Sequence, residues 1–181
     1  WVYRSFTSSE TGLSPLRNRL GGPLRLSDDP VMVIATKRPA LLAGVYREIY
    51  TGYGWGTGLE RQAYAWGNTL RLDQRADLFD QARPGDSLLG EDLRKRLFAD
   101  VRYDVEVRTS LLLNSLPTAR RLADIAGVGE DGVLPNYDAT GEVFARKPLR
   151  NGDRYGFDAN VFRSGASVYD DALLAWEARI L

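Results

Sequence analysis

The sequence predicts a mainly β domain of the α+β class, an antiparallel β-sandwich-like domain with one main helix. Short runs of β-branched and aromatic residues recur along the chain and are bounded by Gly and Pro, as strands and turns are. Residues 101–108 and 155–162 alternate apolar with polar side chains, which is typical of a strand with one wet face. The candidate strands are not separated by regular helices, which favours antiparallel hairpins over parallel βαβ units.

The first part of the chain divides at Pro30. Residues 1–30 are rich in Ser, Gly, Pro and Arg and predict an N-terminal arm or lead-in, and residues 31–165 predict the β-rich domain itself. The domain opens with apolar, β-branched residues that predict a strand at 31–36, and an aromatic-rich run predicts a second strand at 44–50.

A glycine-rich turn follows the second predicted strand. Glycines alternate with other residues from Gly52 to Gly58, a pattern that predicts a flexible turn. Residues 63–66 then resume an extended pattern, and we expect 69–72 to continue it.

The middle of the chain predicts the main helix. Asp86 or Ser87 is suited to cap its N-terminus. The apolar residues that follow recur at the spacing of a helix; they are Leu88, Leu89, Leu93, Leu97 and Phe98.

After the strand at 101–108, the last part of the β-rich domain predicts a hairpin. Residues 142–146 read as a strand, Asn151-Gly152 favours a tight type I′ turn, and 155–162 would then pair back. Residues 166–181 predict a C-terminal helical segment. The chain opens at Trp1 and ends in an apolar-periodic run without a helix stop signal, which predicts a piece of a longer protein.

The composition excludes several kinds of chemistry. The 181 residues include no Cys and no His, which excludes a thiol nucleophile, a Ser-His-Asp triad and zinc sites built from those residues. We therefore predict no catalytic residue, no cofactor and no metal for this chain. Its formal net charge is zero and it has no basic stripe, so we do not expect nucleic acid as a partner.

Aromatic residues concentrate between the second strand and the following extended segment. Two interpretations stay open for them: an exposed platform that stacks on sugars, or a sheet core or interdomain contact. The candidate ligand or interdomain residues are Tyr53, Trp55, Tyr64 and Trp66.

Two other patterns are candidate sites of chemistry, and the local sequence speaks against both. The paired carboxylates Asp28-Asp29 and Asp170-Asp171 would suit glycoside hydrolysis, but both pairs lie beside turn or helix-start signals, which favours capping. The glycine run lacks the third glycine of a dinucleotide fingerprint, because Thr57 stands in its place.

Several segments together resemble one protein family. Leu20-Gly21-Gly22-Pro23, the run 26–32 and the run 44–55, which contains Tyr50-Thr51-Gly52-Tyr53-Gly54-Trp55, look like the bacterial transglutaminase-like membrane proteins. Later pieces in the same order are Tyr103–Val107, Leu116-Pro117 and Gly152–Tyr155. Arg47 and Glu48 depart from the family, which more often has less charged residues there.

The resemblance implies a place and a role. It corresponds to the extracytoplasmic segment between the family's transmembrane helices and its transglutaminase core. The catalytic Cys, His and Asp of that core lie C-terminal to this segment. The parent would be a membrane-anchored thiol acyltransferase or peptidase, and this module would position the core or recruit substrate. Its partners would be that core, of the same polypeptide, and a cell-wall glycan or protein substrate.

Three hypotheses follow. The first is this scaffold module, and the second is a carbohydrate-binding module that needs exposed Tyr53, Trp55 and Trp66. The third is a hydrolase that needs two buried, neighbouring carboxylates in a cleft.

Overall fold

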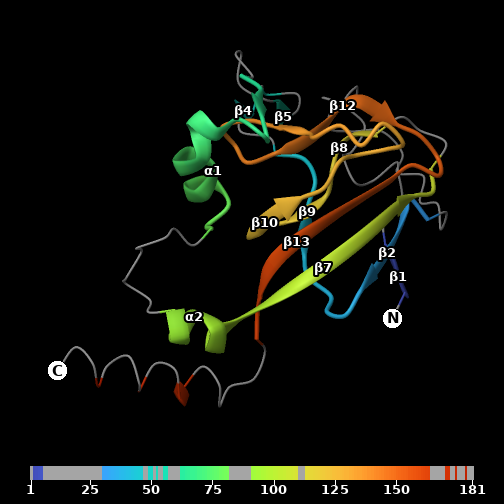
Figure 1. Cartoon of the computed structure of the whole chain (residues 1–181). Helices are drawn as coiled ribbons and strands as arrows, with labels where there is room; N and C mark the ends of the chain where they lie inside the picture. Colours follow the sequence, from blue (N-terminus) through green and yellow to red (C-terminus); the bar gives the residue numbers. More distant parts are fainter. Residues whose placement is uncertain are drawn as a thin grey trace.

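Every strand pairing that the structure describes is antiparallel, which confirms the predicted fold class. A computed structural model describes residues 2–5, 30–46, 49–50, 52, 55–56, 62–81, 91–109, 113–163, 170–171, 174 and 178, and of 2–5, 55–56 and 91–93 it describes the backbone. The larger sheet has the order β1 (Val2–Ser5), β2 (Met32–Thr36), β7 (Phe98–Val107), β13 (Arg154–Phe162) and β10 (Leu122–Ile125) (Figure 1).

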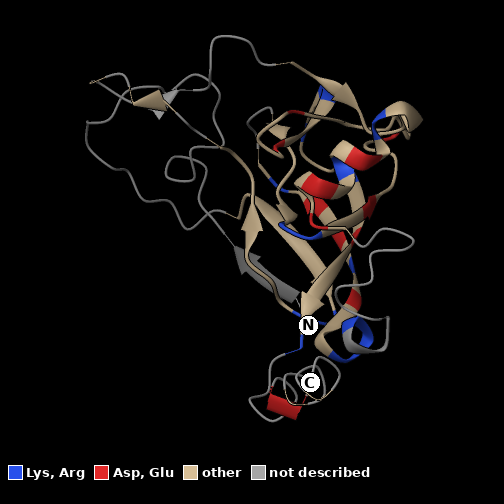
Figure 2. Cartoon of the chain, turned by 90° about the vertical axis from the view of Figure 1, so that its left-hand side faces the viewer, with Lys and Arg blue, Asp and Glu red and all other residues tan. Residues whose placement is uncertain are grey.

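The remaining strands form one further sheet and two short pairs. The smaller sheet has the order β6 (Tyr64–Ala65), β11 (Asn136–Tyr137), β12 (Val143–Leu149) and β8 (Leu113–Ser115). β3 (Leu42–Ala43) pairs with β9 (Thr118–Ala119), and β4 (Ile49–Tyr50) pairs with β5 (Trp55–Gly56). The named helices are η1 (Thr69–Arg71), α1 (Leu72–Leu78) and α2 (Glu91–Leu97). The last turn of α2 contains basic residues, and the ribbon there is blue in Figure 2.

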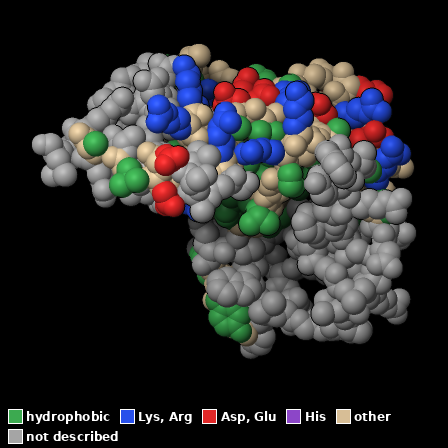
Figure 3. Space-filling model, turned by 90° about the horizontal axis from the view of Figure 1, so that it is seen from below, with side chains coloured by type: hydrophobic (Ala, Val, Ile, Leu, Met, Phe, Trp, Pro, Cys, Tyr) green, Lys and Arg blue, Asp and Glu red, His purple; other side chains and the backbone are tan. Residues whose placement is uncertain are grey.

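The long central strand β7 confirms the predicted alternation. Tyr103, Val105 and Val107 are buried, whereas the charged residues between them face outward. β7 pairs with β2 on one side and with β13 along its whole length on the other. Seen from below, basic and acidic side chains stand side by side in a band on the surface (Figure 3).

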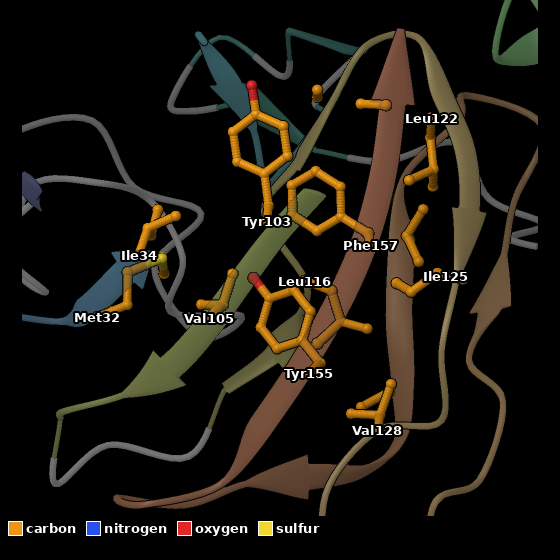
Figure 4. Close-up of a cluster of buried hydrophobic side chains, with 14 of the residues drawn as sticks. Met32, Ile34, Tyr103, Val105, Leu116, Leu122, Ile125, Val128, Tyr155 and Phe157 are labelled. Carbon is orange, nitrogen blue, oxygen red and sulfur yellow. The ribbon is translucent and has the colours of Figure 1, made fainter. Parts of the chain in front are cut away.

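The core gathers side chains from both sheets. The Tyr103 and Phe157 rings stack with centroids 4.7 Å apart, on neighbouring strands β7 and β13. Leu122 and Ile125 of β10 extend this layer, as Figure 4 shows. Tyr137 of the smaller sheet belongs to the same buried cluster, so the two sheets share one core.

The predicted hairpin at the end of the domain is wrong. β12 and β13 lie in different sheets, so the turn between them is a corner from one sheet to the other. The Asp153 amide donates to the Arg150 carbonyl (3.0 Å), and Gly152 has φ +91°. Asn151 has no positive φ, and a type I′ turn requires one at both central residues; the geometry fits a type II turn.

The helical regions differ from the predictions in two places. Residues 69–72, expected to be extended, form η1 and the start of α1, and the Asn68 side chain caps η1 by accepting from the Leu70 amide (3.0 Å). The predicted main helix corresponds to α2, but α1 is equally long at 7 residues, so the described part of the chain does not have one dominant helix. Phe98, expected at the end of the predicted helix, begins β7. The predicted helix start at 86–90 lies outside the described residues.

The predicted strands of the first half are partly correct. The strand predicted at 31–36 is confirmed as β2. The run 44–50 is not one strand: residues 44–46 have no regular structure and β4 holds only its last two residues.

The predicted terminal segments are described in part. Within 1–30, β1 pairs with β2 at the edge of the larger sheet. Within 166–181, the four described residues, Asp170, Asp171, Leu174 and Ala178, are helical and exposed.

Candidate functional site

Trp66, one of the predicted site residues, is a core residue. Its side chain is only 2% exposed, and its ring meets those of Phe79 and Tyr137 edge-on at 5.2 and 5.8 Å. Its Nε1 donates to the Asp124 carboxylate at 3.1 Å, which satisfies the one polar atom of the indole. Trp66 therefore does not form part of an exposed stacking platform.

Tyr64 belongs to the same aromatic group. Its ring centroid lies 5.6 Å from that of Tyr137, and the guanidinium of Arg71 lies 4.2 Å from its centre. Trp55, described by its backbone, pairs with Tyr50 in the β4–β5 hairpin. Tyr53 lies outside the described residues.

Helix α1 is anchored to this aromatic group by arginine. The Arg75 guanidinium stacks over the Trp66 ring at 4.6 Å and donates to the Trp66 carbonyl at 2.6 Å. Such cation–π contacts stabilise a partly buried site by about 0.5–2 kcal/mol. The aromatic cluster therefore connects α1 to the smaller sheet, with Tyr137 as a member that the sequence patterns did not single out.

A pocket of about 490 Å³ opens where four segments of the chain converge. Its volume falls within the range of roughly 300–1,000 Å³ that is usual for ligand sites. The segments are β3 with the residues on either side of it, the C-terminal end of α1, β9 with the residue after it, and the loop between β11 and β12. The lining residues are Leu41, Leu42, Ala43, Tyr46, Leu78, Phe79, Thr118, Ala119, Arg120, Thr140 and Gly141. We call it the Tyr46–Arg120 pocket.

Local pairing positions the walls of this pocket. Leu42 and Ala43 lie opposite Ala119 and Thr118 in the β3–β9 pair, which makes one wall continuous. The β11–β12 loop reaches α1 at Gly141, whose φ of +83° favours glycine. A β-carbon at this position would lie 3.9 Å from the Phe79 ring and 4.0 Å from the Leu78 carbonyl oxygen.

Two carboxylates are buried next to the pocket. Glu142 is 2% exposed, accepts a short hydrogen bond from the Ser115 hydroxyl and accepts the Tyr46 amide at 3.2 Å. It thereby ties β12 to β8 and to the segment that carries Tyr46. Charged acceptors of this kind form hydrogen bonds about twice as strong as neutral ones.

The second buried carboxylate, Asp138, holds the β11–β12 loop. It is 2% exposed, and its Oδ1 accepts from the Thr140 amide (3.0 Å), the Thr140 hydroxyl (2.6 Å) and the Glu142 amide (3.1 Å). The pattern Asp-x-Thr-Gly-Glu at 138–142 is the signal that could have identified this turn in the sequence.

These contacts assign Asp138 and Glu142 a structural role. Each carboxylate receives its hydrogen bonds from the fold itself, and neither belongs to the lining of the pocket. The carboxylate pairs singled out in the sequence are elsewhere: Asp170 and Asp171 are exposed on a helical segment, and Asp28 and Asp29 lie outside the described residues.

The electrostatics of the pocket centre on Tyr46. Burial raises the pKa of its phenol, the charge of Arg120 opposes that rise, and the charges of Glu142 and Asp138 add to it. At neutral pH Tyr46 is therefore a neutral phenol in a field with contributions of both signs.

A second pocket, of about 570 Å³, lies between β12 and the loop at 128–133. The ion pair between Lys147 and Asp131 (2.6 Å) joins its two walls, and Arg146, Arg150, Glu130 and Asp153 also line it. Its acidic and basic side chains are equal in number, so the net charge of its lining is zero.

The described part of the chain shows neither a metal site nor a membrane span. No group of three or more Asp and Glu side chains in it is arranged to hold a metal ion. No helix within those residues has the length and apolar character needed to cross a bilayer.

Comparison of the chain with family models, with curated proteins and with solved structures gives no match.

Proposed function

We propose that this chain is a non-catalytic, extracytoplasmic module of a membrane-anchored, transglutaminase-like thiol enzyme. The module would position the catalytic core of the same polypeptide or recruit its protein or cell-wall substrate. The chain contains no Cys and no His, so a thiol reaction of the parent would depend on residues outside it.

One observation carries the proposal. The segments that resemble this family are far apart in the sequence, yet they contact one another in the core. Met32 pairs with Val107, and Val105 pairs with Tyr155, across three adjacent strands. The buried hydroxyl of Tyr155 donates to the Pro117 carbonyl at 2.9 Å. A resemblance carried by residues that pack together supports a shared fold more than scattered matches would.

The other two hypotheses have less support. A glycan platform needs an exposed Trp66, and Trp66 is buried. A carboxylate hydrolase needs carboxylates that are available to a substrate, and the hydrogen bonds of Asp138 and Glu142 come from their own fold.

The first test is the reading frame that encodes this chain, sequenced from its source. The proposal expects transmembrane helices upstream and a core with Cys, His and Asp downstream. A frame without them would refute it.

The second test is functional. The full-length enzyme in detergent should incorporate a fluorescent primary amine into a glutamine peptide or cleave that peptide. A deletion of the module should lower this activity, whereas removal of the core Cys should abolish it. Undiminished activity of the deletion variant would contradict a positioning or recruiting role.

A further inference from the structure

One leucine in the lining of the Tyr46–Arg120 pocket is almost fully exposed. Leu41 is 95% exposed, directly beside an apolar wall that includes Leu42, Leu78 and Phe79. Single exposed leucines are common, but one that continues an apolar hollow extends the contact area available to a partner.

The described lining of the same pocket contains one charged side chain. Among the described residues that line it, Arg120 alone is charged, and it is exposed. Tyr46, half-buried, supplies an aromatic ring and a phenol beside it. Tyr and Arg around an apolar hollow are the residue types that dominate binding energy in protein interfaces.

We propose that this pocket binds a segment of a partner or substrate protein in which an apolar side chain is followed by an acidic one. The apolar side chain fills the hollow against Leu78 and Phe79, and Leu41 covers it. The acidic side chain pairs with Arg120. The inference deepens the proposed function, on which it rests for the existence of a partner.

Two buried carboxylates oppose the preference of Arg120 for an acidic side chain. Asp138 and Glu142 are buried and outside the lining, and their charges favour a cation near Tyr46, whereas Arg120 favours an anion. Arg120 is on the lining itself and they are not, so a bound side chain approaches Arg120 more closely. Because interaction energy falls with distance, Arg120 decides the preference.

The test is a titration of the ¹⁵N-labelled 181-residue chain with four acetylated, amidated peptides that differ at one or two positions. The probes carry Leu-Asp, Leu-Asn, Leu-Lys or Ser-Asp between Gly-Ser flanks. We expect the amide signals of Ala119 and Gly141 to shift, with Leu-Asp binding most tightly. Replacing Leu by Ser should weaken binding about tenfold, since a buried leucine is lost.

Matched variants assign the effect to the pocket. Arg120→Glu should reverse the preference between Leu-Asp and Leu-Lys, with a change of about fivefold for each, as expected for an exposed charge pair. Arg146→Glu, at an exposed arginine of β12, should leave both affinities unchanged. Leu41→Ser should weaken Leu-Asp binding, whereas Leu70→Ser, at a residue 93% exposed on η1, should not.

Three results would overturn the inference. They are tighter binding of Leu-Lys than of Leu-Asp by the unmodified chain, shifts confined to other amides, and no saturable shift at all. Failure here combined with a reading frame that encodes a thiol core would remove this pocket but keep the proposed function. A reading frame without that core, together with the expected peptide binding, would refute the proposed function but keep this pocket as a binding site.

Discussion

Arg102 lies across the backbone of Gly156 on the outward face of β7 and β13. A β-carbon at Gly156 would stand 2.7 Å from Cζ of Arg102 and 2.9 Å from Oδ1 of Asp104. The guanidinium is held there by Asp104 at 3.1 Å and Asp158 at 3.2 Å. The absence of a side chain at position 156 thus makes room for a cross-strand charge cluster.

Gly156→Ala should displace Arg102 and lower the free energy of unfolding by about 1 kcal/mol, since two exposed ion pairs are lost. In an Arg102→Ala background the same change should instead raise it by about 0.5–1 kcal/mol, because glycine is unfavourable inside a strand. Urea unfolding of the four proteins in this double-mutant cycle measures the coupling. Equal effects of Gly156→Ala in both backgrounds would show that the two residues are independent.

Gly127 provides the comparison for this cycle. A β-carbon there would stand 2.6 Å from the Gly132 Cα and would also meet its carbonyl group. Backbone cannot swing aside as an arginine side chain can, so Gly127→Ala should cost more than Gly156→Ala in every background.

Replacement of Asp138 should separate loss of an acceptor from loss of a charge. Asp138→Ala removes the acceptor of three donors and should lower the free energy of unfolding by about 1–3 kcal/mol. Asp138→Asn keeps an oxygen in place and should cost less than half as much. Urea unfolding measures both, and equal losses would mean that the loop depends on the charge alone.

Alkaline pH should destabilise the fold through its buried tyrosines. Burial raises the pKa of Tyr155 well above its ordinary value, and the pKa values of Tyr103 and Tyr137 rise for the same reason. The unfolded chain therefore loses these protons first, so the stabilisation is complete below about pH 10 and falls at higher pH. Tyr155, whose pKa is raised most clearly, contributes a slope of up to about 1.4 kcal/mol per pH unit between its unfolded and folded pKa values.

Tyr155→Phe isolates one of these groups. It removes the hydrogen bond to the Pro117 carbonyl and should cost about 0.5–1.5 kcal/mol at pH 7. Urea unfolding across the alkaline range should then show a shallower decline than in the unmodified chain. An unchanged slope would mean that Tyr155 ionises equally in both states.

Trp66→Ala should behave as a core deletion and cost about 3–5 kcal/mol. Leu70→Ala, at an exposed residue of η1, should change the stability by less than about 0.5 kcal/mol. Thermal or urea unfolding distinguishes them, and a stable Trp66→Ala variant would contradict the core assignment. Loss of glycan binding in that variant would not by itself identify Trp66 as a contact.

Sequence patterns predicted a strand correctly where the alternation of apolar and polar residues matches alternating burial. The alternation at 101–108 identified β7, because every second residue is buried by neighbouring strands. The similar pattern at 69–72 was misleading, since Leu70 and Leu72 are both exposed and no burial lies behind their spacing. The turn at 151–152 was recognised, but its strands pair with partners distant in the sequence, which the turn residues do not encode.

The candidate site was less predictable than the fold. The buried state of Glu142 depends on Ser115 and on the Tyr46 amide, 27 and 96 residues away in the chain. The aromatic residues near Trp66 were visible in the sequence, but their orientation toward the core depends on Phe79 and Tyr137.

The position of β13 has a consequence for how this protein is made. β13 lies between β7 and β10, so neither of these strands has this neighbour until residue 162 has left the ribosome. Before then the apolar faces that carry Tyr103 and Leu122 lack their common neighbour, and each is a surface for premature association. Its pairing with β7 joins residues that are between 48 (Arg154 and Glu106) and 64 (Phe162 and Phe98) positions apart in the chain. We therefore expect slow folding and a nascent chain that depends on chaperones for this interval.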